Sequence, residues 1–413
     1  MNINKLEMNC IIYTIGDELL MGQTIDTNSA FIAQKLNPIG IKIMERRSIA
    51  DDRKAILDAI AYGMQNHNVI IFTGGLGPTK DDITKKTIAD FFNVPLIRHD
   101  KTFEHVKAFF EKRNRPFLDV NHYQADVPSN CEVLFNKVGT APGMWIEHQG
   151  AILISLPGVP FEMEYLMEYE VIPRLKKRSK TPALIYSYIQ TAGIGESFLA
   201  KNIEFIEEAL PDYIKLSYLP NPYRVNLRLS TTQEYENEML SFKNQMIQEL
   251  GDAVYGESTN TIFEHFFNFL DNRKWLVSFA ESCTGGFFVN EMTNISGASR
   301  ILSESYVVYS EASKMDKLGV AKEIIDAHTV YSAECAEAMA IACLEKSKSH
   351  IAIASTGILE TTKDQKPFAF IAIAIQGKVV SRKVDLFYGR NKNKETVAVV
   401  AIFEALKWLK KDF

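Results

Sequence analysis

Residues 69–92 read VIIFTGGLGPTKDDITKKTIADFF and predict a buried strand, a glycine-rich turn and a helix in direct succession. The same order of strand and amphipathic helix occurs at residues 10–40, 41–65 and 151–178. Strands that alternate with helices in this way form a mostly parallel sheet with helices on both faces. The sequence therefore predicts an α/β fold for the first part of the chain.

The length of the chain indicates several domains, because 413 residues exceed what one hydrophobic core usually supports. A basic stretch and Pro182 follow the last helix of the first part, and a small α+β pattern of two helices and about three strands comes next. A second α/β pattern begins near Thr261. We expect a multidomain α/β protein with an α/β/α domain at residues 1–176, an α+β domain at 177–256 and an α/β domain at 257–413.

Composition and charge narrow the classes of function. Hydrophobic residues make up 46% of the chain and charged residues 23%, which is typical of a folded globular protein. The net charge of −5 with no basic block argues against a nucleic-acid binder. The longest apolar run, residues 368–375, is far below the roughly 20 residues of a membrane span. The N-terminal apolar run, residues 10–15, is short and leads into a Gly-acidic motif instead of a cleavage site, so we do not expect secretion. The five cysteines lack disulfide or zinc spacing. We expect a cytoplasmic location.

Acidic and glycine-rich loops predict an anion site in the first domain. Glycines and threonines in the turn at residues 73–84 could cradle a phosphate, and adjacent carboxylates could hold a divalent cation against it. A second acidic loop, at residues 16–28, follows the first strand, so both loops would face one crevice. The alternative is that these glycines and aspartates are ordinary turn formers and helix caps.

Four motifs in order, GDELLMGQTIDTNS (16–29), TGGLGPTKDDIT (73–84), GTAPGMW (139–145) and LPGVPFEME (156–164), resemble the molybdopterin-binding-like domain of the CinA family. This resemblance implies a metal-dependent ADP-ribose pyrophosphatase that uses a divalent cation of the Mg, Mn or Co class. It implies Glu18, Asp26, Asp81 and Asp82 as metal ligands, with Asp81 and Asp82 also catalytic. It implies Gly74, Gly75, Gly77, Thr79, Asn28 and Thr84 as contacts of ADP-ribose or a related nucleotide.

The middle segment, with TAGIGES at residues 191–197, is similar to the KH-like domain of the same family. A nucleic-acid clamp of this kind needs a GXXG loop with basic flanks, and here Glu196 stands beside the glycines. We therefore expect a spacer or dimer-forming role. The resemblance implies a homodimer, and the apolar segments 263–270 and 397–409 offer hydrophobic surface for one, although core packing explains them almost as well.

The last domain carries AESCTGG at residues 280–286, GAS at 297–299 and YVVYS at 306–310, followed by Lys314, and resembles the CinA C-terminal domain. That domain includes nicotinamide mononucleotide deamidases. The resemblance implies Ser299 as nucleophile, Lys314 as base and Tyr309 in the proton relay. Amides near Thr284 and Gly285, or at Ser299, would hold the oxyanion. Taken alone, Ser299 could be a helix cap, Lys314 a solvated residue and Cys283 a buried small residue.

Two departures from the family pattern put the last activity in doubt. Residues 359–366 replace a Gly-Pro-Gly-rich loop, and Glu304 and Ser305 replace glycines before the YVVYS strand. Both changes add bulk and charge, so we expect slow or absent deamidation. Three alternatives follow: an enzyme with both activities, an enzyme with the first activity and an assembly domain, or a non-catalytic protein linked to competence or DNA damage.

Overall fold

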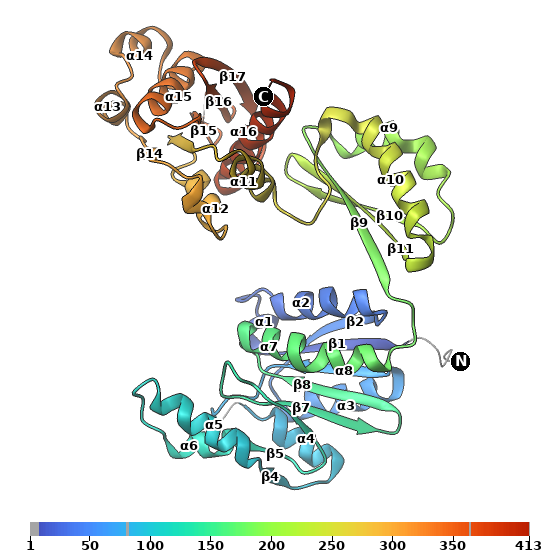
Figure 1. Ribbon diagram of the computed structural model, residues 1–413. Coiled ribbons are helices and arrows are strands. Elements are labelled where there is room, and N and C mark those ends of the chain that lie inside the picture. Colours follow the sequence, from blue (N-terminus) through green and yellow to red (C-terminus); the bar gives the residue numbers. More distant parts are fainter. Residues whose placement is uncertain (1–7, 80–81, 363–364, 413) are drawn as a thin grey trace. The chain divides into compact units, whose positions relative to one another are not determined.

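The computed structural model describes residues 8–79, 82–362 and 365–412 (Figure 1). The chain forms two compact units, residues 1–185 and 186–413, and each is taken by itself below. No helix among the described residues has the length and apolar character that a bilayer crossing requires. All five cysteines are free thiols.

A six-stranded sheet forms the centre of the first unit, in the order β2-β1-β3-β8-β7-β6. The first four strands in that order are parallel to one another, whereas β7 runs antiparallel to both of its neighbours. The strands are β1 (Asn9–Ile15), β2 (Lys42–Ile49), β3 (Val69–Thr73), β6 (Glu132–Leu134), β7 (Gly143–His148) and β8 (Ala151–Leu156). The buried runs of β3 and β8 match their central positions, because a central strand is covered on both faces.

Helices cover both faces of this sheet, as the alternating pattern predicts (Figure 1). Ile32 and Leu36 of α2 pack with Met163 of α7 on one face, and Ile56 of α3 packs with Ile88 of α4 on the other. The helices are α1 (Asp17–Leu20), α2 (Thr27–Leu36), α3 (Arg53–Asn66), α4 (Thr84–Phe92), α7 (Pro160–Leu166) and α8 (Ile172–Arg178). A π-helical turn over Met167–Val171 separates α7 from α8, where the sequence predicts one helix.

A small lobe between β3 and β6 is not predicted from the sequence. It contains β4 (Leu96–Arg98), α5 (Asp100–Glu111), α6 (Asp119–His122) and β5 (Asp126–Pro128), with β4 and β5 antiparallel. Edge-to-face contacts among aromatic rings pack the lobe internally, such as those of Phe117 with Phe103 and Phe110. The lobe contacts the GTAP loop, since His105 Nε2 lies 3.2 Å from the Gly139 carbonyl oxygen.

The second unit begins with a four-stranded sheet in the order β10-β11-β9-β12, covered by two helices (Figure 1). Its elements are β9 (Leu184–Ala192), α9 (Glu196–Glu208), β10 (Lys215–Asn221), β11 (Arg224–Thr232), α10 (Glu236–Leu250) and β12 (Val254–Gly256). Burial alternates residue by residue along β11, which is the pattern of a sheet with one face against a core. This is the small α+β element set that the sequence predicts.

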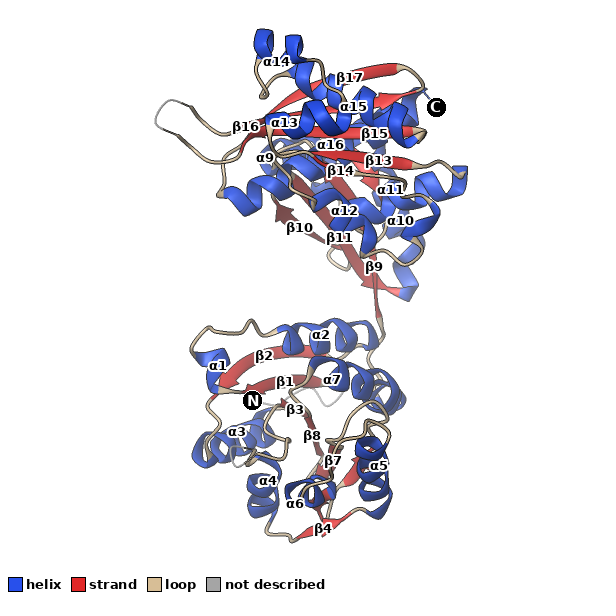
Figure 2. Cartoon of the chain, turned by 90° about the vertical axis from the view of Figure 1, so that its left-hand side faces the viewer, coloured by secondary structure: helices blue, strands red, loops and turns tan. Residues whose placement is uncertain are grey.

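A five-stranded sheet, β14-β13-β15-β16-β17, follows in the same unit (Figure 2). The helices α11, α12 and α16 contribute to the core on one face, and α14 and α15 to the core on the other. The strands are β13 (Val277–Glu281), β14 (Tyr306–Val307), β15 (Ile351–Ile358), β16 (Phe368–Ile375) and β17 (Lys378–Asp385). The helices are α11 (Ile262–Arg273), α12 (Phe287–Thr293), α13 (Glu311–Ser313), α14 (Lys322–His328), α15 (Ala333–Ser347) and α16 (Arg390–Asp412). The predicted multidomain α/β fold class is confirmed.

Most of the apolar side chains of α11 and α16 lie inside this core. Phe266 and Leu270 of α11 are fully buried, as are Val400 and Ile402 of α16. The hydrophobic surface that the sequence offers for a dimer is therefore used in folding the chain. The homodimer stays a prediction that rests on the family resemblance alone.

Candidate functional site

The motifs of the first unit meet at one edge of its sheet. Because β1, β3 and β8 are parallel neighbours, the loops that follow Ile15, Thr73 and Leu156 leave the same edge. Strand β7 is antiparallel to β8, so the loop that leads into Gly143 lies there too. A cavity of about 130 Å³ opens at this edge. Its walls are Thr14, Ile15, Glu18, Leu19, Thr24, Ile25, Asp26, Thr27, Asn28, Thr73, Gly158 and Pro160.

Asp26 caps the helix that borders this cavity. Its carboxylate accepts hydrogen bonds from the Ser29 amide at 2.9 Å and from the Ser29 hydroxyl at 2.5 Å, and the Thr14 hydroxyl donates to it at 3.3 Å. An aspartate at the start of a helix commonly fills this role. Asp26 therefore fixes the first turn of α2, and with it the adjacent Asn28.

Asn28 presents an unused acceptor at the cavity. Its Nδ2 donates to Thr73 Oγ1 at 3.1 Å and to the Gly158 carbonyl at 2.8 Å, which links three loops and fixes the orientation of the amide. Its Oδ1 is buried and has no hydrogen-bond partner within the described part of the chain. A buried acceptor without a partner is costly, so this oxygen is suited to a donor on a ligand, such as a hydroxyl group.

The TGGLGPT turn, residues 73–79, binds the carboxylate of Asp82, which follows it in the chain. The amides of Gly77 and Thr79 donate to Asp82 at 2.7 and 2.8 Å, and the Thr79 hydroxyl donates to it at 2.5 Å. Backbone amides that converge on a negative group form an anion nest. The structure thus gives the Gly77 and Thr79 amides an anionic partner, which is Asp82 instead of a phosphate. Asp81 lies outside the described residues.

Gly74 and Gly75 allow a close approach of chain segments. Gly74 has φ of 121°, and a Cβ there would lie 2.4 Å from the Ile15 carbonyl oxygen. A Cβ on Gly75 would lie 2.1 Å from Thr84 Oγ1, a buried hydroxyl with no hydrogen-bond partner among the residues that the structure describes. The glycines bring the turn after β3 against β1, and the Thr84 hydroxyl lies directly behind the turn.

The predicted metal ligands are only partly free to bind a cation. Among the described residues, no three or more His, Cys, Asp or Glu gather into a metal-ligating group. Asp26 and Asp82 are engaged as hydrogen-bond acceptors of their own loops. Glu18 lines the cavity and its carboxylate makes no hydrogen bond within the described part of the chain. Among the predicted ligands that the structure describes, Glu18 is therefore the one available to a cation.

In the second unit, Lys314 meets a serine that the sequence did not indicate. Lys314 is 1% exposed, and its Nζ donates to Ser282 Oγ at 2.9 Å. It also donates to the carbonyl oxygens of Val308 at 3.0 Å and Tyr309 at 3.3 Å. Ser282 is itself only 5% exposed and follows the last residue of β13. Burial lowers the pKa of Lys314, because removal from water disfavours the charged amine.

The three hydrogen-bond partners of Lys314 determine how its neutral amine would be oriented. A neutral amine has two N–H groups, and the carbonyls of Val308 and Tyr309 can accept both. The lone pair is then left for the third direction, toward Ser282 Oγ. This arrangement can take the proton of the Ser282 hydroxyl, which is what activates a serine as a nucleophile.

Ser299, the predicted nucleophile, is not among the hydrogen-bond partners of Lys314, whereas Ser282 is. Ser299 is exposed, in a short 3₁₀ turn over Ala298–Arg300. The next residues run beside the start of β13, since the Val277 amide donates to the Ile301 carbonyl at 2.7 Å. Ser282 lies beyond the other end of that strand. A rise of about 3.3 Å per residue puts roughly 16 Å between Val277 and Ser282.

Tyr309 contributes its backbone, and not its phenol, to Lys314. The Tyr309 side chain is 62% exposed, and its hydroxyl accepts a hydrogen bond from Arg390 at 2.9 Å. Arg390 also pairs with Glu360 at 3.4 Å. Lys394, one turn further along α16, has its Nζ 3.5 Å from the position of a Cβ on Gly285. Two cationic side chains of α16 thus lie near the loops that hold Ser282 and Lys314.

The predicted oxyanion donors are mostly engaged. Buried Glu281 accepts hydrogen bonds from the amides of Gly286, Phe288 and Val289, and so caps α12. The Gly285 amide donates to the Ser282 carbonyl at 3.2 Å, within the turn. The Thr284 amide makes no hydrogen bond to the described residues. Of the amides predicted between Thr284 and Gly286, that of Thr284 is the one free to meet an oxyanion.

Two comparisons with known proteins match this architecture. The family described as "Probable molybdopterin binding domain" matches residues 11–177, and "CinA C-terminal domain" matches residues 259–413. A CinA-like protein of Flavobacterium psychrophilum is 43% identical over 98% of this chain and 98% of its own. The chain belongs to the CinA family. A CinA-like protein of Cytophaga hutchinsonii is 37% identical over 96% of this chain and 97% of its own.

A solved structure of CinA from Thermoplasma acidophilum covers 41% of this chain and 98% of its own at 30% identity, with a TM-score of 0.38. The resemblance to the CinA family that the motifs indicated is confirmed by the two family matches and the full-length relatives. This CinA protein has a molybdopterin-binding-type first domain and a CinA C-terminal domain.

The residues that depart from the CinA pattern are hydrogen-bonded or ion-paired within the fold. The Ser305 hydroxyl accepts from the Phe279 amide at 3.1 Å, so Ser305 extends the sheet edge beside the middle of β13. Leu359 is buried, and its carbonyl accepts from Asn393 at 2.8 Å. The segment after β15 is thereby fixed against the start of α16, and its Glu360 partly neutralises Arg390.

Sequence reasoning also missed Glu162 of this CinA protein. Its carboxylate accepts from Asn136 at 2.6 Å under the GTAP loop, and a Cβ on Gly139 would overlap it. Burial raises the pKa of Glu162. A polar residue inside the otherwise apolar face of α7 was the signal for it. For Ser282 the signal was its place at the carboxyl end of a strand, where α/β sheets bind ligands.

Proposed function

We propose that the C-terminal domain is an amidohydrolase in which Ser282 is the nucleophile and Lys314 the base. The hydrogen bond of 2.9 Å between Lys314 Nζ and Ser282 Oγ, inside a buried site, carries this proposal. A solvated lysine is protonated at neutral pH and cannot act as a base. Here burial lowers its pKa, and two backbone carbonyls orient the amine.

The proposed substrate is nicotinamide mononucleotide, as the family resemblance implies. Ser282 Oγ attacks the carboxamide carbon, and its proton passes to Lys314 Nζ. The Thr284 amide, which makes no hydrogen bond to the described residues, would stabilise the oxyanion. When the C–N bond breaks, Lys314 returns the proton to the leaving ammonia, and an ester on Ser282 remains. Water, deprotonated by Lys314, hydrolyses that ester to nicotinate mononucleotide and the free serine.

The cationic side chains of α16 fit the phosphate of such a substrate. Lys394 lies next to Gly285, and Arg390 lies next to Tyr309, whose carbonyl accepts from Lys314. Charge-assisted bonds to a phosphate are stronger than neutral ones. The pair between Arg390 and Glu360 competes with a phosphate for Arg390, and we therefore expect weak substrate binding and slow turnover.

The pH dependence of ammonia release tests the role of Lys314. The neutral amine is the active form and its pKa is lowered by burial. The rate should therefore rise with pH through that lowered pKa, about tenfold per unit below it, and level off above it. We would measure ammonia from nicotinamide mononucleotide between pH 5.5 and 10, with a Ser282→Ala variant as the blank at each pH. A rate that is flat or falls with rising pH contradicts the proposal.

We also propose that the first domain cleaves the pyrophosphate bond of ADP-ribose or a related nucleotide. The buried, unpartnered Asn28 Oδ1 at the cavity supports a ligand that carries hydroxyl donors, as a ribose does. A divalent cation of the Mg, Mn or Co class would neutralise the pyrophosphate charge when bound. Of the predicted carboxylates in the described part of the chain, Glu18 is the one available to it.

Asn28→Ala tests this second site. Loss of the amide removes the Asn28 donor from Thr73 Oγ1, which keeps its own hydrogen bond to the Pro157 carbonyl, and leaves a ligand hydroxyl without its acceptor. We expect kcat/KM for ADP-ribose to fall about tenfold, the equivalent of about 1.4 kcal/mol. The matched control is Asn66→Ala, which removes an exposed amide at the end of α3 that bonds only its own helix. AMP and ribose 5-phosphate would be quantified with Mg²⁺, Mn²⁺ or Co²⁺ and with excess chelator. Equal kcat/KM in the two variants contradicts the role of Asn28, and equal rates in chelator contradict the cation.

A further inference from the structure

Glu281 is a fully buried carboxylate that the proposed reaction does not use. It is 0% exposed and ends β13, directly before Ser282. Along this strand Val277, Phe279 and Glu281 point to the same face of the sheet, and Val277 and Phe279 belong to its apolar core. A charge removed from water at such a place is costly unless hydrogen bonds compensate it. Its hydrogen-bond partners therefore indicate what this side chain does.

The carboxylate is bound by the turn that carries Ser282. One of its oxygens accepts hydrogen bonds from the Gly286 amide at 2.8 Å and from the Phe288 amide at 3.2 Å, and the other accepts from the Val289 amide at 3.2 Å. Burial raises the pKa of Glu281, and the hydrogen bonds that it accepts oppose that rise because they favour the ionised form. The first turn of α12 is thus tied to the residue that precedes the serine.

The turn between Ser282 and Gly286 needs such a constraint. Gly285 has φ of 60° and Gly286 has φ of 95°, and glycine adopts these values as readily as many others. Two adjacent glycines therefore give the turn many alternative shapes. Three hydrogen bonds to a carboxylate held in the core restrict these alternatives, and so set the positions of the Ser282 hydroxyl and of the Thr284 amide.

The main chain of the same residue is bound to the Lys314 side of the site. The Glu281 carbonyl accepts from the Val308 amide at 2.8 Å, and the Val308 carbonyl accepts from Lys314 Nζ at 3.0 Å. On the other side, the Ser282 amide donates to the Ser355 carbonyl at 3.0 Å, which fixes the end of β13 against β15. Glu281 therefore connects to the base through its backbone and to the turn of the nucleophile through its side chain.

We propose that Glu281 is a positioning residue for the nucleophile: its buried carboxylate holds the turn at residues 282–286 so that the Ser282 hydroxyl faces Lys314. This inference rests on the amidohydrolase function proposed above. Because Glu281 is fully buried, it acts through the turn and not on the substrate itself. Its loss should therefore slow the attack by Ser282 and leave substrate binding, which is proposed to use the cationic side chains of α16, nearly unchanged.

Glu281→Gln tests this role, because it keeps the size of the side chain and removes the charge and one acceptor oxygen. The glutamine oxygen can replace the carboxylate oxygen that accepts from Gly286 and Phe288, but the new nitrogen then faces the Val289 amide, which also donates. We expect kcat for ammonia release from nicotinamide mononucleotide to fall at least about tenfold, with KM within about twofold of the wild type. A role in stability alone predicts a lower melting temperature without this division between kcat and KM.

Chemical labelling of Ser282 separates this proposal from the choice of substrate. A fluorophosphonate reacts with an activated serine: an oxygen–phosphorus bond forms, fluoride leaves and the serine proton passes to the base. The rate of labelling of Ser282 in the full chain would be measured by mass spectrometry, with Ser282→Ala as the blank. It should fall at least about tenfold in Glu281→Gln, and this measurement needs no nicotinamide mononucleotide.

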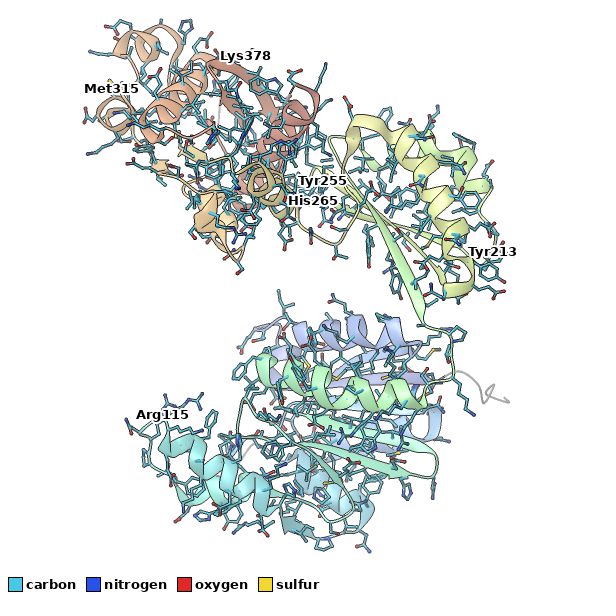
Figure 3. The ribbon with its side chains drawn as sticks, viewed as in Figure 1. Arg115, Tyr213, Tyr255, His265, Met315 and Lys378 are labelled. Atoms are coloured by element: carbon cyan, nitrogen blue, oxygen red, sulfur yellow. The ribbon has the colours of Figure 1, made fainter. Side chains whose placement is uncertain are left out.

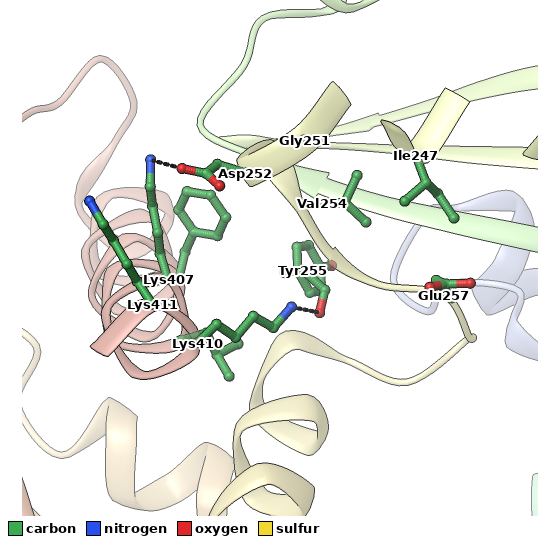
Figure 4. A pocket seen from close by; sticks show the side chains of 11 residues that line it. Ile247, Gly251, Asp252, Val254, Tyr255, Glu257, Lys407, Lys410 and Lys411 are labelled. Atoms are coloured by element: carbon green, nitrogen blue, oxygen red, sulfur yellow. Dashed lines mark hydrogen bonds and ion pairs between the residues drawn. The ribbon is translucent and has the colours of Figure 1, made fainter. Parts of the chain in front are cut away.

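Glu257→Gln is the control, because it makes the same chemical change in the same unit. Glu257 follows β12, lines the cleft between β12 and the last turns of α16 (Figure 4), and pairs with the buried Lys243 at 3.0 Å. Figure 3 shows Tyr255 of β12 well apart from Met315, which follows Lys314. The control also removes a charged partner and lowers stability, but its labelling rate and kcat should stay within about twofold of the wild type.

Equal labelling rates in the wild type and in Glu281→Gln overturn the proposal, and so does an equal fall in Glu257→Gln, since lower stability would then explain both. Absence of labelling at Ser282 in the wild type refutes the proposed nucleophile and the positioning role with it. Labelling that depends on Glu281 without ammonia release refutes only the proposed substrate. The melting temperature verifies that each variant is folded at the assay temperature. If Glu281→Gln is not, Glu281→Asp, which keeps the charge but is one methylene shorter, takes its place with the same expected fall.

Discussion

Ser282→Ala is expected to lower ammonia release from nicotinamide mononucleotide by at least about 10³-fold, the equivalent of about 4 kcal/mol of transition-state stabilisation. The change removes the oxygen that would form the ester, and no neighbouring group is placed to replace it. Cys283, the next residue, is fully buried, and burial raises the pKa of its thiol to about 12, so it remains a protonated and poor nucleophile.

Ser299→Ala is the matched control for this experiment, because it makes the same chemical change at an exposed serine. Its rate should stay within about twofold of the wild type. Both variants should melt within a few degrees of the wild type, since neither substitution removes a large buried group. Loss of activity in Ser299→Ala with full activity in Ser282→Ala would restore the nucleophile that the sequence suggested and refute the one that the geometry supports.

Gly74→Ala should destabilise the first unit by about 3 kcal/mol. Position 74 has φ of 121°, a conformation that an alanine adopts only with strain. The added Cβ would also lie 2.4 Å from the Ile15 carbonyl oxygen, at the centre of the sheet edge. Relief of that overlap would separate the turn after β3 from β1 and disturb the contact of Gly158 with Gly74.

Scanning calorimetry of the full chain would measure this effect. A loss of about 3 kcal/mol in a unit of this size lowers the melting temperature by roughly 6–12 °C. Gly150→Ala is the control, because Gly150 also has positive φ but has open space around it. It should cost only the backbone strain, about 1 kcal/mol. Equal destabilisation by the two substitutions would show that the close approach of residue 74 to the Ile15 carbonyl does not contribute to the loss of stability.

The sequence identified the fold class correctly because strand and helix patterns are local. A buried run such as residues 69–73 and the helix after it each follow from the spacing of apolar residues over a few positions. The lobe of α5 and α6 was missed, although Phe103, Val106 and Phe110 recur at helical spacing along α5. Its edge strands, β4 and β5, are three residues each, too short to show an alternation.

The sequence by itself determined the α/β class, the membership of the CinA family and the loops that carry the motifs. The tertiary structure decided which serine meets Lys314. Ser282 stands in AESCTGG and Ser299 in GAS, and both motifs belong to the family pattern, so the motifs alone do not decide between the two serines. The pairing of β14 with the end of β13 carries the following loop, and with it Lys314, to Ser282. Strand pairing and burial are set by the whole chain, and so is the lowered pKa of that lysine, because its cause is the removal of water by residues distant in sequence.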